Sequence, residues 1–180
     1  MNRGLVAAAA YLALASTAGA APSAAMSRLH EVASATGAAP DAIGRGAAVM
    51  GLDMKLIRKG SNGWTCFPDD PATPGNDPMC VDANGLEWMQ AMMSHRPPPA
   101  GKVGIAYMLA GGSDASNTDP FATKPAPGGK WVVTGPHLMI LSATVAAASG
   151  YPIREANPDT SKPYVMFGGT PYAHIMAPVK

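Results

Sequence analysis

Glycine and proline divide the second half of the chain into short apolar runs. From Lys102 onward, runs such as KVGIAYMLA and YVMF alternate with loops rich in glycine, proline and aspartate. Short apolar runs with turn residues between them are typical of antiparallel strands, and the interspersed prolines exclude a long helix. This half of the chain is therefore predicted to form a sheet. The segment SATVAAAS is also compatible with one short helix.

The first half of the chain carries helix signals. Apolar residues recur at helical spacing from Met26 to Thr36 and a glycine ends the run, which predicts a helix. Asp82 is a suitable N-cap for a second helix that extends to His95, where RPPP stops it. Helices that come early and strands that come late indicate an α+β domain. We predict one such domain over residues 21–180, with an antiparallel sheet and two or three helices packed on it.

A tight turn is predicted ahead of the first cysteine. Asn62 and Gly63 lie between MKLIRK and WTCF, and both residue types tolerate the positive φ of a two-residue turn. The pattern predicts a hairpin in which these two segments pair directly with each other.

Residues 1–20 have the pattern of an export signal. Met1 to Arg3 carry positive charge, an apolar stretch follows, and Ala18-Gly19-Ala20 provides the small residues that a signal peptidase recognises. Later apolar runs are shorter than the ~20 residues of a transmembrane helix. We therefore expect cleavage after Ala20 and a periplasmic or secreted chain, with no membrane insertion after cleavage.

Charge and aromatic content argue against polyanionic partners. The chain has 13 Lys and Arg against 12 Asp and Glu, and aromatic residues make up only 6% of it. Nucleic-acid binding needs concentrated positive charge, usually with aromatic residues among it. We therefore expect no nucleic-acid partner.

Two cysteines, Cys66 and Cys80, are present in the whole chain. In an exported protein such a pair is most simply a disulfide. The intervening FPDDPATPGNDPM contains four prolines and is predicted to be an irregular loop. Closing it contributes roughly 3 kcal/mol of stability on the chain-entropy model. A redox role is not favoured, because the spacing is not CxxC.

Two His-x-Met triplets form the most specific candidate site. Residues i and i+2 of a strand point the same way, so His137 lies beside Met139, and His174 beside Met176. If the two strands are neighbours, two imidazoles and two thioethers share one face, and this ligand set suits copper. The alternative is that both triplets belong to buried core strands that need no metal. Each triplet follows a similar segment, YMLAGG in one case and YVMFGG in the other.

The loop GGSDASNTDP offers two weaker candidates. Its oxygen-bearing side chains suit Ca²⁺, but their spacing does not match an EF-hand, and turn formation explains the same composition. Ser113 with a late histidine suggests a hydrolase, although the GxSxG elbow that exposes such a serine is missing from the sequence.

Longer motifs resemble those of a family of exported bacterial proteins to which no activity is assigned. The resemblance extends from about Arg58 to Val179, through GSNGWTC, DPMC, YMLAGGSDAS, GPHLM and YAHIM. It implies secretion, a single domain and the disulfide, but it supplies no catalytic residue. Function therefore depends on the site itself.

These observations favour a non-enzymatic periplasmic binding or accessory protein over an enzyme. In the most specific version of this hypothesis, the protein holds copper through the side chains of His137, Met139, His174 and Met176. One alternative is a small secreted hydrolase that uses Ser113 with a histidine. Another is an envelope interaction protein that has no small-molecule site.

Overall fold

The computed structural model describes residues 24–179, and the predicted signal peptide at 1–20 lies outside this range. The described residues form four helices, which are α1 (Ala24–Thr36), α2 (Asp41–Gly44), α3 (Ala83–Met93) and α4 (Ala143–Ala148). They also form ten strands, namely β1 (Ala48–Met50), β2 (Leu56–Arg58), β3 (Thr65–Phe67), β4 (Met79–Val81), β5 (Gly104–Met108), β6 (Gly112–Asp114), β7 (Val132–Thr134), β8 (His137–Leu141), β9 (Tyr164–Met166) and β10 (His174–Pro178). The predicted α+β class is confirmed. No helix within residues 24–179 has the length and apolar character needed to cross a membrane.

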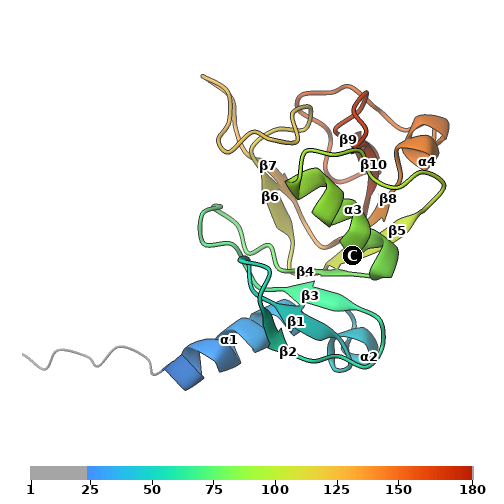
Figure 1. Ribbon diagram of the computed structural model, residues 1–180. Coiled ribbons are helices and arrows are strands. Elements are labelled where there is room, and N and C mark those ends of the chain that lie inside the picture. The colour runs from blue at the N-terminus through green and yellow to red at the C-terminus, as the bar shows by residue number, and fades with distance from the viewer. Residues whose placement is uncertain (1–23, 180) are drawn as a thin grey trace, which may run out of the picture.

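Eight of these strands form one sheet that runs through the whole molecule (Figure 1). Their order is β2-β1-β3-β4-β5-β8-β10-β9, and β6 and β7 form a separate two-stranded ribbon. The sheet is mixed, since β1 and β3 run parallel while the other neighbouring strands described in it are antiparallel. The sheet was predicted to be antiparallel, and the parallel pair is the exception.

The predicted hairpin at Asn62-Gly63 is wrong. The strand β2 pairs with β1, and β1 then lies between β2 and β3. Gly63 does take a positive φ of 78°, and the Asn62 side chain accepts a hydrogen bond from the Trp64 amide, so the chain does turn here. However, Asn62 also donates to the carbonyl of Ile43 in α2, which ties the turn to that helix rather than to a strand partner. The sequence analysis did not predict the short strand β1. This strand lies between β2 and β3, so those two strands cannot pair directly as the hairpin required.

The helices follow the sequence signals closely. The helix α1 ends at Thr36, as predicted, and Asp82 caps α3 by accepting a hydrogen bond from the Gly85 amide at 2.7 Å. The helix α3 ends at Met93, two residues before the predicted end. SATVAAAS takes the helical alternative as α4, where Ser142 accepts from the Val145 amide.

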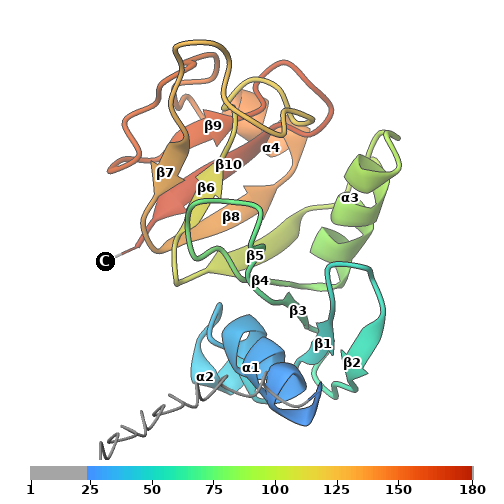
Figure 2. The same ribbon diagram turned by 90° about the vertical axis from the view of Figure 1, so that its left-hand side faces the viewer.

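The sheet separates three core clusters. On one face α1 covers β1, β3 and β4, and α4 covers the strands at the other end of the sheet. The opposite face lies beneath α3 and the β6–β7 ribbon (Figure 2). Its cluster contains nine of the twelve methionines, and we call it the methionine-rich face. Those nine are Met50, Met54, Met79, Met89, Met92, Met108, Met139, Met166 and Met176.

The predicted disulfide is present. Cys66 and Cys80 are direct cross-strand partners on β3 and β4, and both are fully buried. They lie under α1, on the side of the sheet away from the methionine-rich face. The bond therefore closes the proline-rich loop and joins two central strands.

Candidate metal centre on the methionine-rich face

The strands that carry the two His-x-Met triplets are neighbours. In the register of β8 and β10, Met139 lies directly opposite Met176. His137 lies opposite Pro178 at one end of this ladder, and His174 stands on β10 two residues before Met176. Because side chains alternate along a strand and paired residues share a face, both triplets present His and Met to the same side of the sheet.

The two histidines lie on either side of the methionine pair. The register places them four residues apart along the ladder, which is roughly 13 Å at about 3.3 Å per residue. The two imidazoles therefore meet at one ion only if both rings lean toward Met139 and Met176. Burial lowers the pKa of His174, and a positive charge on the nearby His137 lowers it further.

Two further methionines stand beside the histidines. Met108 on β5 is the direct cross-strand partner of His137, and Met166 on β9 is the partner of His174. Sequence reasoning did not identify them as site residues. The signal was present in the similar segments YMLAGG and YVMFGG, because each contains the methionine that pairs with one histidine.

Both imidazoles are held in the same tautomer by the same local contact. The Nδ1 atom of His137 is 2.7 Å from the Gly135 carbonyl oxygen, and Nδ1 of His174 is 2.9 Å from the Tyr172 carbonyl oxygen. A carbonyl only accepts, so in each neutral ring the proton is on Nδ1 and Nε2 carries the lone pair. This is the arrangement in which a backbone carbonyl orients an imidazole for metal binding through Nε2.

Burial keeps both rings neutral. Burial lowers the pKa of His137, although the hydrogen bond to Gly135 acts in the opposite direction. Burial also lowers the pKa of His174 to about 4, and the nearby His137 adds to this effect. A neutral imidazole is the form that binds a metal.

The Nε2 atom of His137 is buried and has no hydrogen-bond partner among the described residues. A buried acceptor without a partner costs free energy, so its presence in a native structure asks for an explanation. Gly112 of the β6–β7 ribbon lies over this ring. A Cβ atom at Gly112 would lie 3.1 Å from His137 Cε1 and 3.6 Å from Met108 Sδ. A side chain at Gly112 would therefore press on both the imidazole and the thioether.

His174 lies in a tighter enclosure. Its ring makes edge contacts with Trp88 and Phe167, with ring centroids 5.3 and 5.4 Å away. Phe167 has a φ of 55°, an uncommon conformation for an aromatic residue, and its amide donates to the Asn117 carbonyl. A Cβ at the following Gly168 would overlap the Ile153 carbonyl oxygen, so only glycine fits there. The segment that contacts His174 is thus fixed by its backbone.

Ser113 points away from the histidines. On β6 its neighbour Gly112 faces His137, and side chains alternate along the strand. The Ser113 hydroxyl donates to the Asp77 carboxylate at 3.0 Å and accepts from the Gly75 amide at 3.1 Å. These contacts attach the disulfide loop to the ribbon. Within the described residues, the hydrogen-bond partners of the Ser113 hydroxyl are Gly75 and Asp77 rather than a histidine, so the geometry gives the hydrolase alternative no support.

Asp114 is the next residue on the ribbon, and the pKa of its carboxyl group is raised. Burial raises its pKa to about 7, and the negative charge of Asp77 adds to this shift. On the same side, the Tyr164 hydroxyl lies 2.7 Å from the Thr134 hydroxyl. Burial raises the pKa of Tyr164 to about 12. Near neutral pH, a proton on Asp114 therefore limits the negative charge next to the methionine-rich face.

The loop that was considered for calcium behaves as an ordinary turn. Ser116 and Asp119 accept hydrogen bonds from backbone amides within the loop. The Asn117 side chain is buried and donates to the Glu155 carbonyl. In the part of the chain that the structure describes, no cluster of three His, Cys, Asp or Glu side chains is arranged to hold a metal. Any metal centre in this part would therefore depend on thioether ligands.

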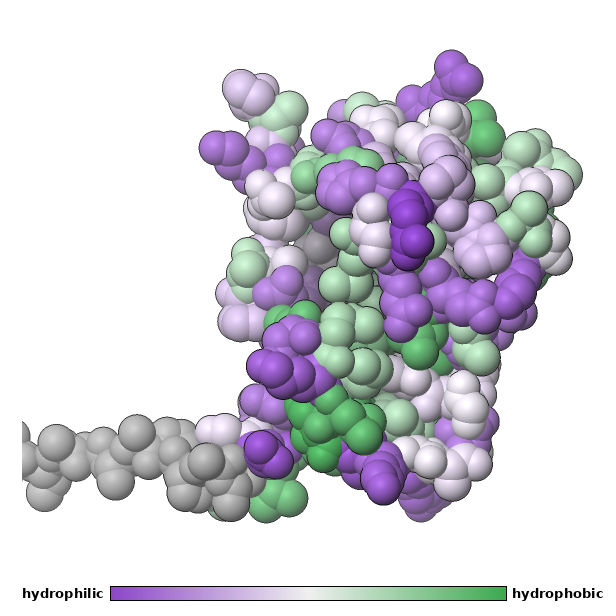
Figure 3. All heavy atoms as spheres, in the orientation of Figure 1, coloured by the Kyte–Doolittle hydropathy of each residue, from purple (hydrophilic) through white to green (hydrophobic). Residues whose placement is uncertain are grey.

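An exposed apolar patch lies at the opposite end of the sheet from His137 and His174. Apolar side chains gather where α1 meets the β1–β2 hairpin (Figure 3), and Leu29, Leu52 and Leu56 are 65%, 46% and 56% exposed. A groove runs between these elements and the disulfide loop. Such a patch is the type of surface that protein partners use. Nothing in residues 24–179 covers it.

Comparisons with protein-family models, with curated proteins and with solved structures gave no match to this chain.

Proposed function

We propose that this protein is an exported, non-enzymatic accessory protein that binds Cu(I) on its methionine-rich face. The observation that carries the proposal is the unpartnered, buried Nε2 of His137 beside the thioether of its cross-strand partner Met108. A bound metal ion supplies the missing partner. The tautomer fixed by Gly135 leaves this nitrogen available as a ligand.

The donor set favours a soft monovalent ion. Thioether sulfur binds Cu(I) in preference to hard ions such as Mg²⁺ and Ca²⁺, which take oxygen ligands. The imidazole and thioether ligands are neutral, so they do not offset the positive charge of the ion. Burying one charge costs less than burying two, and this favours Cu(I) over divalent ions.

The ligands that we propose form a row across three strands. His137 provides the first nitrogen, and the thioethers of Met108, Met139 and Met176 lie on the same face beside it. His174 is the second proposed nitrogen ligand, and it stands on β10 two residues before Met176. No carboxylate takes part, and Asp114 lies on the ribbon above with a pKa of about 7.

A Cu(I) titration tests this proposal. The folded chain is titrated without oxygen, against a chromogenic Cu(I) chelator, with ascorbate as the reductant because a thiol would compete for copper and reduce the disulfide. We expect one equivalent of Cu(I) to bind. The double variant His137→Ala and His174→Ala should lose it. The matched control is His30→Ala, which removes an exposed imidazole from α1.

A folded wild-type protein that takes no Cu(I) from the chelator contradicts the proposal. A double variant that binds as well as the wild type contradicts the assigned ligands. Circular dichroism of each variant before titration separates loss of a ligand from loss of the fold.

A further inference from the structure

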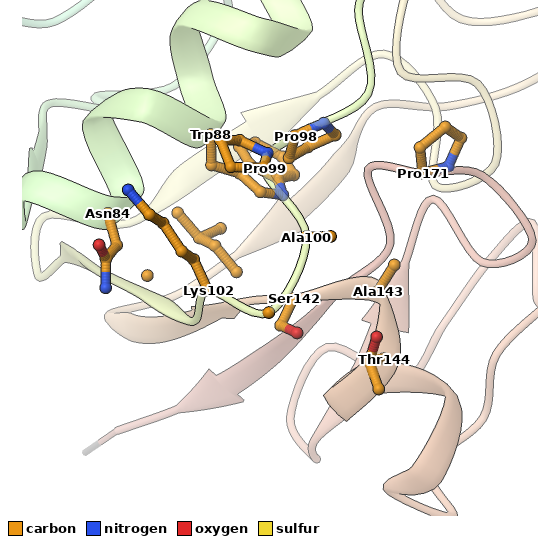
Figure 4. A pocket seen from close by; sticks show the side chains of 13 residues that line it. Asn84, Trp88, Pro98, Pro99, Ala100, Lys102, Ser142, Ala143, Thr144 and Pro171 are labelled. Atoms are coloured by element: carbon orange, nitrogen blue, oxygen red, sulfur yellow. The ribbon is translucent and has the colours of Figure 1, made fainter.

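A cavity of about 180 Å³ opens between the start of α3, the loop after it and the end of β8 (Figure 4). Pro98 and Pro99 form one wall together with the indole of Trp88, and Pro171 stands across from them (Figure 4). Successive prolines hold the loop in an extended conformation without flexible side chains. The cavity therefore has a rigid apolar wall before any ligand arrives. Trp88 lines this cavity and also contacts His174, with ring centroids 5.3 Å apart, so the cavity adjoins the methionine-rich face.

Trp88 is one of the residues that line this cavity. The residue is only 6% exposed, and its Nε1 has no hydrogen-bond partner among the described residues. Buried indole N–H groups usually have an acceptor, because leaving one unpaired costs free energy. The indole ring lies against the cavity, so its N–H signal reports on a ligand that enters there.

The other polar side chains of the lining belong to Asn84, Ser142, Thr144 and Lys102, and the Asn84 amide group donates to the Val103 carbonyl. Ser142 accepts from the Val145 amide through its oxygen, which leaves its hydroxyl proton to be donated. Thr144 contributes a second hydroxyl, and Lys102 lies at the rim. The described lining includes no Asp or Glu side chain. Lys102 does pair with Glu87, but both are about 45% exposed, and exposed ion pairs of this kind are weak enough to exchange.

We infer that this cavity binds a small organic carboxylate with an apolar body. The proline and indole wall contacts the apolar part, and the carboxylate accepts from the hydroxyls of Ser142 and Thr144 while Lys102 balances its charge. An apolar pocket with a few convergent donors is the usual form of a small-molecule site. The inference concerns a different site from the proposed copper centre and does not depend on it.

Benzoate is a suitable probe, and benzyl alcohol is its neutral counterpart. The chain contains three tryptophans, so its ¹⁵N–¹H spectrum contains three indole signals, and Trp88→Phe identifies the one from Trp88. We expect benzoate to shift the Trp88 indole signal in a saturable way at millimolar concentration. Benzyl alcohol should shift it at least tenfold less at the same concentration.

Two lysine variants test the charge. Lys102→Met should weaken benzoate binding at least fivefold, while Lys59→Met, which removes an exposed lysine beyond the far end of the sheet, should leave it unchanged. An unmoved Trp88 signal overturns the inference. Equal shifts with benzyl alcohol, or full affinity in Lys102→Met, overturn the carboxylate assignment. The copper titration uses other variants and another ligand, so either test can fail without the other.

Discussion

Met139 and Met176 are direct cross-strand partners on β8 and β10, and His137 and His174 flank this pair on the same face of the sheet. The arrangement places thioethers between two neutral imidazoles. It also explains why methionine, rather than leucine, fits a ligand role at these positions, because only the thioether provides a lone pair.

Replacing Gly112 with alanine should block the site without removing a ligand. The new Cβ enters the space between His137 Cε1 and the Met108 thioether. We expect the affinity for Cu(I) to fall at least tenfold, measured by chelator competition. Gly135→Ala is the matched control, because a Cβ there meets nothing within 4 Å. Equal affinities for the two variants would show that the ion does not use this space.

The two buried histidines should stay neutral in mild acid. The pKa of His174 is lowered to about 4, below the usual 6.5, and that of His137 is also lowered. The unfolded chain therefore takes up more protons between pH 6.5 and 4, and the free energy of unfolding falls as the pH drops through this window. The contribution of His174 alone is about 3 kcal/mol. Imidazole ¹³C–¹H shifts followed by NMR test this, and a His174 that titrates near pH 6.5 contradicts the buried environment.

Asp114 should change the free energy of unfolding with pH in the opposite direction to the two histidines. Its folded-state pKa of about 7 exceeds the ordinary 3.8, so the folded chain holds the extra proton and stability falls as the pH rises from about 4 to 7. Asp114→Asn should remove this loss. We expect the variant to gain roughly 2–4 kcal/mol relative to the wild type between pH 4 and pH 8, by urea unfolding. A difference that stays constant with pH would mean that Asp114 ionises normally.

Much of this architecture follows from local patterns. The cap at Asp82, the end of α1 at Thr36 and the i, i+2 placement of His137 beside Met139 each depend on neighbouring residues, and all of them are found. What could not be predicted depends on register between distant strands. The pairing of Met108 with His137 joins β5 to β8, and no local signal fixes that alignment.

The error at Asn62-Gly63 has the same origin. The two residues make a turn, but which strand lies beside which is decided by β1, a three-residue element too short to recognise in the sequence. The four-residue offset between the two histidines is likewise a property of the ladder, and it changes a simple four-ligand cluster into a row.

The disulfide should contribute to stability through the loop that it closes. Cys66 and Cys80 are 14 residues apart, so replacing both with alanine should cost about 3 kcal/mol in urea unfolding.

Ser113→Ala, which breaks the contacts to Asp77 and Gly75, tests how far hydrogen bonds hold the same loop. It should cost about 1 kcal/mol. A double cysteine variant as stable as the wild type would show that these bonds suffice.

X-ray absorption at the copper edge of the protein loaded with one equivalent of Cu(I) tests the central claim most directly. The account predicts sulfur bound to copper together with imidazole nitrogen, and a weaker sulfur signal when Met139 is replaced by leucine. The matched control is Met93→Leu, which removes a methionine that is 52% exposed and outside the row. Copper bound only to nitrogen and oxygen, or a spectrum that Met139→Leu leaves unchanged, would contradict a soft-metal centre on the methionine-rich face.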